Sequence, residues 1–336
     1  MIALIMAGGV GSRLWPMSTK DIPKHFIKLF ENKSMLRLTY ERISPIVKNE
    51  DIYIVSIESQ LNRILSDLPE LTKDQIIIEP CAMNTAPCIA LSLLTLAEKF
   101  NSNETLLLLP ADHYISETQM FQSSIAKAVE LAKTGNLITL GITPTYPATG
   151  YGYIERGYAY DHFAYNVSKF VEKPSYDKAV EYLEKGNFYW NSGMFCFRID
   201  TMRNSFYQYQ ETLILEIKKV TESSDASERY EIYSRLNKMP IDTAIFEKAD
   251  NILVLPVSFP WSDVGNWNSL SDLFPKDINE NSVEIKGYFY NAFRNDVFSK
   301  KKVAILGVSD LVVVETDEAL LVMNKSEAEN VKNVVF

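Results

Sequence analysis

Short apolar runs alternate with segments of helical periodicity over the first 140 residues, and this alternation constrains the fold most. Five runs bounded by turn residues predict buried strands: Ile2–Met6, Ile52–Ser56, Gln75–Ile78, Thr105–Leu109 and Leu137–Leu140. Four segments between them predict helices: Met35–Ile46, Ser59–Leu68, Pro87–Phe100 and Phe121–Lys133. Such alternation predicts an α/β fold, a three-layer Rossmann-like domain with a mixed, mostly parallel sheet covered on both faces.

The pattern changes after Thr149. Further strands are predicted at Tyr151–Glu155, Ser168–Glu172 and Gly193–Arg198, and helical segments at Tyr176–Lys185 and from Asp200 to about Asn237. Beyond residue 280, short strands separated by turn residues dominate: Val283–Tyr290, Val303–Leu306, Leu311–Glu315 and Ala319–Met323. We therefore predict a main domain over residues 1–275 and a small β-rich C-terminal domain over residues 276–336.

The charge balance and cysteine content exclude several classes of protein. The net charge is -9, which argues against a nucleic-acid partner. No apolar run has the length of a membrane span, and the N-terminus does not resemble a signal peptide. Three cysteines without CxxC spacing argue against a disulfide framework and favour a reducing cytoplasm.

A glycine-rich run, Ala7-Gly8-Gly9-Val10-Gly11-Ser12-Arg13-Leu14, follows the first predicted strand. Glycines let backbone N–H groups approach a phosphate closely, and Arg13 and Lys24 add positive charge nearby. A dinucleotide-binding loop would need glycine in place of Leu14, and the GxxxxGK[ST] spacing is missing. The alternatives that stay open are a phosphate-binding loop and a plain strand-to-helix turn.

Two aspartates on separate loops are candidate metal ligands. Asp112 follows the buried strand that ends at Leu109, where α/β sheets bind ligands. Asp263 lies between Trp261 and Trp267 in a glycine-containing loop. Mg²⁺ prefers a few carboxylates together with substrate phosphates, so the pair would suit Mg²⁺ if the two loops meet. Otherwise each aspartate would cap a turn or helix.

Seven ordered motifs together resemble the sugar-nucleotidyltransferase superfamily and, within it, the mannose-1-phosphate guanylyltransferase family. They are Gly8-Gly9-x-Gly11-x-Arg13-Leu14-Trp15-Pro16 with Pro23-Lys24, Glu79-Pro80-x-x-x-Asn84-Thr85-Ala86-Pro87, Pro110-Ala111-Asp112-His113, Thr149-Gly150-Tyr151-Gly152-Tyr153-Ile154, Glu172-Lys173-Pro174, Trp190-Asn191-Ser192-Gly193-Met194-Phe195 and Trp261-Ser262-Asp263-x-Gly265-Asn266-Trp267. The resemblance covers residues 1 to about 275. The C-terminal tail is similar to the short left-handed β-helix-like module of such relatives.

The resemblance implies the site residues and their roles. The GTP site would comprise Ala7, Gly8, Gly9, Gly11, Ser12, Arg13, Lys24, Glu79, Asn84, Thr85, Ala86, Pro110 and Asp112. Mannose 1-phosphate would be bound by Gly152, Glu172, Lys173 and Asn191. The catalytic residues would be Arg13, Lys24, Asp112 and Asp263, of which the two aspartates would hold Mg²⁺.

The implied reaction joins GTP and mannose 1-phosphate into GDP-mannose and pyrophosphate, in a cytoplasmic homodimer that binds neither nucleic acid nor membrane. One alternative is the same reaction with glucose 1-phosphate and UTP or dTTP. The other is a non-catalytic nucleotide-sugar-binding regulatory subunit.

Overall fold

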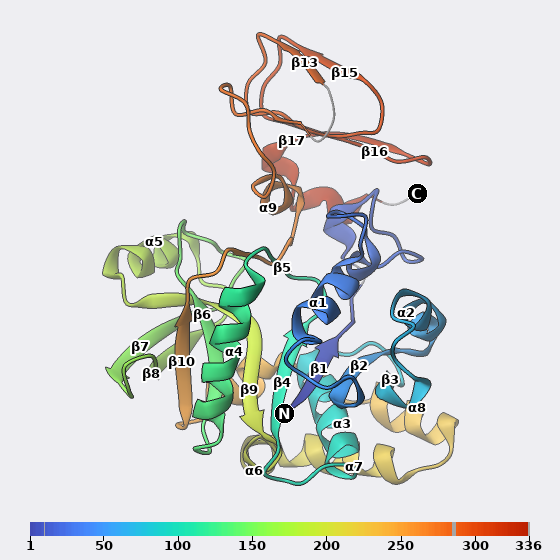
Figure 1. The fold of residues 1–336 in the computed structure, drawn as a ribbon, viewed down its shortest axis with the longest axis vertical. Helices are drawn as coiled ribbons and strands as arrows, with labels where there is room; N and C mark the ends of the chain where they lie inside the picture. Colours follow the sequence, from blue (N-terminus) through green and yellow to red (C-terminus); the bar gives the residue numbers. More distant parts are fainter. Residues whose placement is uncertain (10, 284–286, 335–336) are drawn as a thin grey trace. The chain divides into compact units, whose positions relative to one another are not determined.

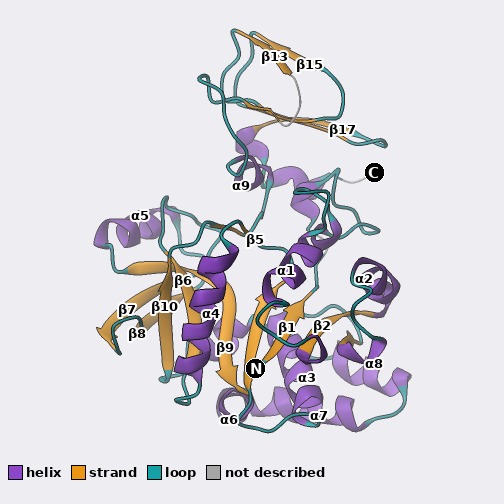
Figure 2. Ribbon diagram, viewed as in Figure 1, coloured by secondary structure: helices purple, strands orange, loops and turns teal. Residues whose placement is uncertain are grey.

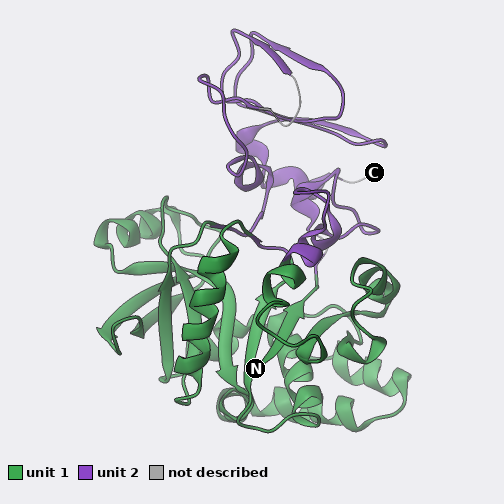
Figure 3. Cartoon of the chain, viewed as in Figure 1, with its two compact units in different colours: residues 1–8, 39–111, 115–260 green, residues 9–38, 112–114, 261–336 purple. Residues whose placement is uncertain are grey.

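The computed structural model describes residues 1–9, 11–283 and 287–334, which form two compact units (Figure 1, Figure 3). Unit 1 comprises Met1–Gly8, Thr39–Ala111 and Ile115–Pro260, and unit 2 comprises Gly9–Leu38, Asp112–Tyr114 and Trp261–Phe336. The predicted boundary after residue 275 falls inside unit 2, so the division into residues 1–275 and 276–336 stays a prediction.

A nine-stranded mixed sheet forms the centre of unit 1, in the order β3-β2-β1-β4-β9-β6-β10-β8-β7. Its strands are β1 (Ile2–Met6), β2 (Ile52–Ile57), β3 (Ile76–Glu79), β4 (Thr105–Pro110), β6 (Leu137–Ile142), β7 (Tyr153–Ala159), β8 (Tyr165–Val171), β9 (Phe188–Arg198) and β10 (Ile252–Val257). Strands β3, β2, β1 and β4 are parallel, as are β6 and β10. Strand β9 runs antiparallel to β4 and β6, and β8 runs antiparallel to β10 and β7.

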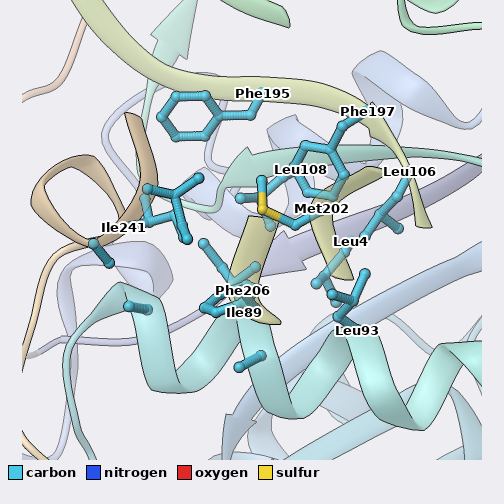
Figure 4. Packing of buried hydrophobic residues seen from close by; sticks show 14 of the residues in the cluster. Leu4, Ile89, Leu93, Leu106, Leu108, Phe195, Phe197, Met202, Phe206 and Ile241 are labelled. Atoms are coloured by element: carbon cyan, nitrogen blue, oxygen red, sulfur yellow. The ribbon is translucent and has the colours of Figure 1, made fainter. Parts of the chain in front are cut away.

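Helices cover both faces of this sheet (Figure 2). The helices that begin in residues 35–234 are α1 (Met35–Ile43), α2 (Leu61–Asp67), α3 (Thr85–Ala97), α4 (Thr118–Ala132), α5 (Tyr176–Lys185), α6 (Ile199–Tyr209), α7 (Glu211–Glu222) and α8 (Ala226–Ser234). Helix α4 packs on β6, β9 and β10, while α3 and α6 pack with α7 on the opposite side. Leu4 and Leu108 from the strands meet Ile89, Leu93 and Phe206 from these helices (Figure 4).

The structure differs from the sequence prediction in several places, including strand β10, which was not predicted. The stretch predicted as helical after Asp200 is three helices, because Gln210 adopts a non-helical backbone (φ -143°, ψ 46°) and Asp225 caps a new helix by accepting a hydrogen bond from the Ser227 N–H. Strand β9 begins at Phe188, five residues before the predicted Gly193. None of the described helices is both long and apolar enough to cross a membrane.

The strands of the C-terminal part of unit 2 form two small sheets. Its strands are β12 (Ser282–Val283), β13 (Gly287–Tyr290), β14 (Asp296–Phe298), β15 (Val303–Leu306), β16 (Leu311–Glu315) and β17 (Leu320–Asn324). Strands β12, β14 and β16 pair in parallel, β13 and β15 form a second parallel pair, and β17 closes the first sheet antiparallel to β16. Successive strands therefore alternate between sheets, as in a β-helix. The predicted strand Val283–Tyr290 lies partly outside the described residues.

Helix α9 (Trp267–Ser271) and strand β11 (Trp261–Ser262) precede this module in unit 2, and β5 (Tyr114–Ile115) follows Asp112. One hydrophobic cluster joins Leu14 of the glycine loop, Val264 and Trp267 of the Asp263 loop, and Phe298 and Val331 of the C-terminal module. The loops that carry the predicted phosphate and metal ligands therefore share a core with the β-rich segment.

Candidate active site

Two predicted site segments leave the same edge of the unit 1 sheet. Strands β1 and β4 are parallel neighbours, and their last residues, Met6 and Pro110, are opposite each other in the register. Ala7 and Ala111 come next, and both are buried. The glycine-rich run and Asp112 therefore begin at the carboxyl ends of adjacent strands, the position where α/β sheets bind ligands.

Gly11 needs to be glycine for two reasons. Its φ of 71° lies in the left-handed region, and a Cβ atom there would overlap Cβ of Lys24. Ser18 holds the turn by donating its hydroxyl hydrogen to the carbonyl of Gly11. Gly8 and Gly9 are exposed, and apart from their chain neighbours no described residue has an atom within 4 Å of the place a Cβ would occupy, so their backbone is open to a ligand.

The ammonium of Lys24 lies between the two predicted metal ligands. Lys24 is only 7% exposed, and its Nζ donates to Oδ2 of Asp112 at 2.7 Å and to the main-chain carbonyl of Asp263. Burial acts to raise the pKa of Asp112, but the charges of Lys24 and His113 outweigh it and hold that pKa below its ordinary value. Residues 112 and 263, which are 151 positions apart in the sequence, thus share one cation.

The loop that carries Asp263 is held in an uncommon conformation. Val264 adopts a positive φ of 47° although its side chain is fully buried, and its strained backbone persists because the surrounding core fixes it. Asp263 Oδ1 accepts the Gly265 N–H at 3.0 Å. Trp267 anchors the loop to the N-terminal segment by donating its indole N–H to the Trp15 carbonyl at 2.9 Å.

Two aspartates on loops that meet at Lys24 are residues of the type that suits a magnesium ion also bound by a substrate. Among the described residues, no group of three or more His, Cys, Asp or Glu side chains is placed to hold a metal ion. Two carboxylates are too few for an all-protein cage, but Mg²⁺ commonly takes one or two carboxylates and completes its octahedron with phosphates and water. The buried Lys24 ammonium shows that the position between Asp112 and Asp263 already stabilises positive charge.

Arg13 forms an ion pair with a residue of the C-terminal module. Its Nε is 3.0 Å from Oε2 of Glu329, near the end of the described chain. The structure therefore brings together three of the four predicted catalytic residues, Lys24, Asp112 and Asp263, and pairs the fourth with a residue that the sequence pattern did not indicate.

Two residues of the predicted GTP site, Glu79 and Asn84, are held by hydrogen bonds within unit 1. Glu79 is buried, and its Oε1 accepts hydrogen bonds from the Met83 N–H at 3.0 Å and the Tyr233 hydroxyl at 2.8 Å. Asn84 caps α3 by accepting the Thr85 N–H at 2.7 Å. Through these contacts Glu79 stabilises the conformation of the segment between β3 and α3.

The predicted sugar-binding residues lie together in unit 1. A Cβ on Gly152 would come within 2.8 Å of Oε2 of Glu172 and 3.3 Å of Cβ of Asn191, so the three residues are neighbours. Lys173 places its Nζ 2.8 Å from Oε1 of Glu172 and adopts a left-handed φ of 47°. The cluster combines a carboxylate, an amide and an exposed ammonium, which suit sugar hydroxyls and a phosphate.

Asp242 belongs to this cluster although the sequence pattern did not indicate it. Its Oδ1 accepts from Nδ2 of Asn191 at 2.8 Å. The Asn191 Oδ1 accepts from Oγ1 of Thr139 at 3.2 Å and from the Gly193 N–H at 3.1 Å, so the amide is fixed in orientation. Burial, and then the charge of Glu172, raise the pKa of Asp242 to about 6. Asp242 begins a π-helical turn (Asp242–Phe246), and no sequence motif marks this position.

Asp242→Asn should raise stability at neutral pH. The folded pKa is above the ordinary 3.8, so the ionised carboxylate destabilises the fold above about pH 6, and this penalty disappears as the pH falls towards 4. Asparagine can still accept from Asn191, and we expect a gain in the free energy of unfolding of about 2 kcal/mol at pH 7.5 and almost none at pH 4. Urea denaturation at both pH values measures this. A variant less stable than wild type at pH 7.5 would contradict it.

Gly152→Ala should weaken binding of the sugar phosphate selectively. The added methyl group would push Glu172 and Asn191 from their places, so KM for the sugar phosphate should rise roughly tenfold. Gly150→Ala is the matched control, since a Cβ there has no atom within 4 Å. Steady-state kinetics with each substrate varied in turn would test the pair. Equal kinetics for the two variants would contradict the assignment.

The chain is similar to known proteins over its whole length. The Nucleotidyl transferase family model matches residues 2–280, and the MannoseP isomerase/GMP-like beta-helix domain model matches residues 297–336. The chain is 37% identical to a mannose-1-phosphate guanylyltransferase of Klebsiella pneumoniae over 346 residues, covering 100% of this chain and 73% of the relative. It is 38% identical to one of Salmonella muenchen over 348 residues, covering 100% and 72%.

A solved structure from Thermus thermophilus, described as a mannose-1-phosphate geranyltransferase, is similar over almost the whole length. The TM-score is 0.88 and the sequence identity 36%, and the match covers 99% of this chain and 97% of that one. Both the α/β domain and the β-helix-like tail therefore have a counterpart among solved structures.

Proposed function

Since the chain belongs to the mannose-1-phosphate guanylyltransferases of the nucleotidyl transferase family, we propose that it transfers GMP from GTP to α-D-mannose 1-phosphate, forming GDP-mannose and pyrophosphate. The observation that carries the chemistry is the meeting of Asp112, Asp263 and Lys24 around one positive charge. A reaction between two polyanions needs such a place, where charge on phosphate oxygens can be neutralised.

The reaction is an in-line displacement. A phosphate oxygen of mannose 1-phosphate attacks the α-phosphorus of GTP, forming the new P–O bond while the bond to the bridging oxygen of the β-phosphate breaks and pyrophosphate leaves. The nucleophile is already an anion, so no general base is required. Catalysis then consists of positioning and charge neutralisation.

Different residues of this chain would bind the metal, the nucleotide and the sugar phosphate. Asp112 and Asp263 would hold Mg²⁺, which when bound supplies Lewis-acid neutralisation of phosphate oxygens. Lys24, Arg13 and the backbone N–H groups around Gly8, Gly9, Gly11 and Ser12 bind triphosphate oxygens. Ala7, Glu79, Asn84, Thr85, Ala86 and Pro110 shape the nucleotide site. Gly152, Glu172 and Asn191 orient the sugar hydroxyls, Asp242 holds the Asn191 amide, and Lys173 pairs with the sugar phosphate.

A substrate panel tests the proposal. Pyrophosphate release is measured with GTP, ATP, UTP and dTTP against mannose 1-phosphate and glucose 1-phosphate, with Mg²⁺ and with EDTA. We expect the highest kcat/KM with GTP and mannose 1-phosphate, and activity only with the metal. Preference for glucose 1-phosphate with UTP or dTTP would replace the proposed substrates, and tight GDP-mannose binding without turnover would indicate a regulatory subunit.

The homodimer and the cytoplasmic location are also proposed. Cys81, Cys88 and Cys196 are free thiols, which favours a reducing compartment. Light scattering coupled to size-exclusion chromatography would measure the oligomeric state. A mass near twice 38.3 kDa is expected, and a monomer would contradict it.

A further inference from the structure

A carboxylate from the C-terminal module links two loops of the candidate active site. Glu329 places Oε2 3.0 Å from Nε of Arg13, and its Oε1 accepts from Nδ2 of Asn266 at 2.7 Å. Arg13 belongs to the glycine-rich loop, and Asn266 follows Asp263 by three residues. Three segments far apart in the sequence are thus joined through one side chain, within unit 2.

The segment that carries Glu329 is firmly anchored although its side chain is 57% exposed. Ala328 and Val331, on either side of it, are 2% and 4% exposed and pack in the cluster that contains Leu14 and Trp267. Nearby, Nδ2 of Asn268 donates to the Lys325 carbonyl at 2.9 Å. The anchored backbone and the two contacts of the carboxylate together define the place of the Glu329 side chain.

The contact with Glu329 leaves other hydrogen-bonding groups of Arg13 and Asn266 available. A guanidinium has five N–H donors, and binding at Nε leaves donor capacity on the terminal nitrogens for a phosphate. Asn266 gives Glu329 its amide hydrogen, while its Oδ1 caps α9 by accepting the N–H groups of Asn268 and Ser269, both at 3.0 Å. Glu329 can therefore remain bound while Arg13 contacts a ligand and the Asp263 loop keeps its shape.

We propose that Glu329 is a positioning residue that sets Arg13 in place for the triphosphate, so that the C-terminal module takes part in nucleotide binding. This inference rests on the proposed function for the identity of the nucleotide. An exposed ion pair contributes little to the stability of the fold, so we expect the main effect on the ligand that Arg13 contacts.

The test compares Glu329→Gln with Glu327→Gln. Glu327 lies in the same exposed segment and accepts from Nδ2 of Asn330 at 2.7 Å, so it controls for the loss of one charge. Glutamine at 329 can still accept from Asn266 but loses the charge that pairs with Arg13. We expect the KM and the calorimetric Kd for the nucleotide to rise roughly three- to tenfold. KM for the sugar phosphate should stay within about twofold, as should both parameters in Glu327→Gln.

A double-mutant cycle with Arg13→Ala makes the test specific. If Glu329 acts through Arg13, Glu329→Gln should change the nucleotide Kd by less than about 1.5-fold in the Arg13→Ala background, and Glu329→Asp should restore part of the lost affinity. An equal loss in both backgrounds, kinetics equal to those of Glu327→Gln, or tighter nucleotide binding would each overturn the proposal. The experiment uses the nucleotide that the wild type prefers in the substrate panel. A preference for a nucleotide other than GTP would then contradict the proposed function without deciding the role of Glu329.

Discussion

Asp263→Asn should lower kcat by roughly 10²- to 10⁴-fold, because it removes the carboxylate of one of the two aspartates whose loops meet at the Lys24 ammonium. Stability should change by less than about 1 kcal/mol. The bond from Lys24 goes to the main-chain carbonyl of residue 263, which the substitution leaves in place. The new amide oxygen can also accept the Gly265 N–H that Oδ1 now accepts.

The measurement is a magnesium titration of pyrophosphate release, with thermal unfolding of the same preparations. Asp272→Asn is the control, since Asp272 is an exposed aspartate nine residues further on that pairs with Lys276 at 3.0 Å. It should retain activity within about twofold. Near-normal turnover of Asp263→Asn at ordinary magnesium concentrations would remove Asp263 from the proposed metal site.

Gly11→Ala should reduce kcat/KM by at least roughly a hundredfold. The new methyl group would overlap Cβ of Lys24, and relieving that overlap moves either the glycine loop or the ammonium shared by Asp112 and Asp263. A displacement of about 1 Å at a catalytic group is enough for a loss of this size. Alanine at a φ of 71° adds about 1 kcal/mol of backbone strain.

Gly135→Ala is a control that introduces the backbone strain of an alanine at positive φ without displacing a catalytic group. Gly135 has a φ of 87°, but no atom lies within 4 Å of the place its Cβ would occupy. This control should lose about 1 kcal/mol of stability and keep its kcat/KM. If Gly11→Ala loses stability to the same extent and remains as active as the control, then the close packing of Gly11 on Lys24 has no part in catalysis.

The short-range pattern predicted the first half of the fold well. Strands β1 and β4 end within a residue of their predicted limits, because a short apolar run between turn residues is decided locally. Strand β10, between β6 and β8, was not predicted, since its pairing depends on partners more than 80 residues away and Pro256 interrupts the usual strand signal. A mixed sheet of this order follows from long-range pairing, which periodicity does not encode.

Some residues of the candidate site could be predicted from local motifs, and others could not. The glycine loop, Lys24, Asp112 and Asp263 stand in distinctive local motifs, and the structure brings Lys24 to both aspartates. Asp242 and Glu329 stand in unremarkable sequence. The first matters because Asn191, 51 residues earlier, hydrogen-bonds to it. The second matters because Ala328 and Val331 anchor it beside Arg13. Such roles arise from packing between distant segments.

The most direct test of a metal site shared by Asp112 and Asp263 is anomalous diffraction from crystals grown with Mn²⁺ and a non-hydrolysable GTP analogue. We predict one Mn²⁺ peak coordinated by carboxylate oxygens of both aspartates and by phosphate oxygens of the nucleotide. An ion bound to the nucleotide with either carboxylate outside its coordination sphere would contradict the account.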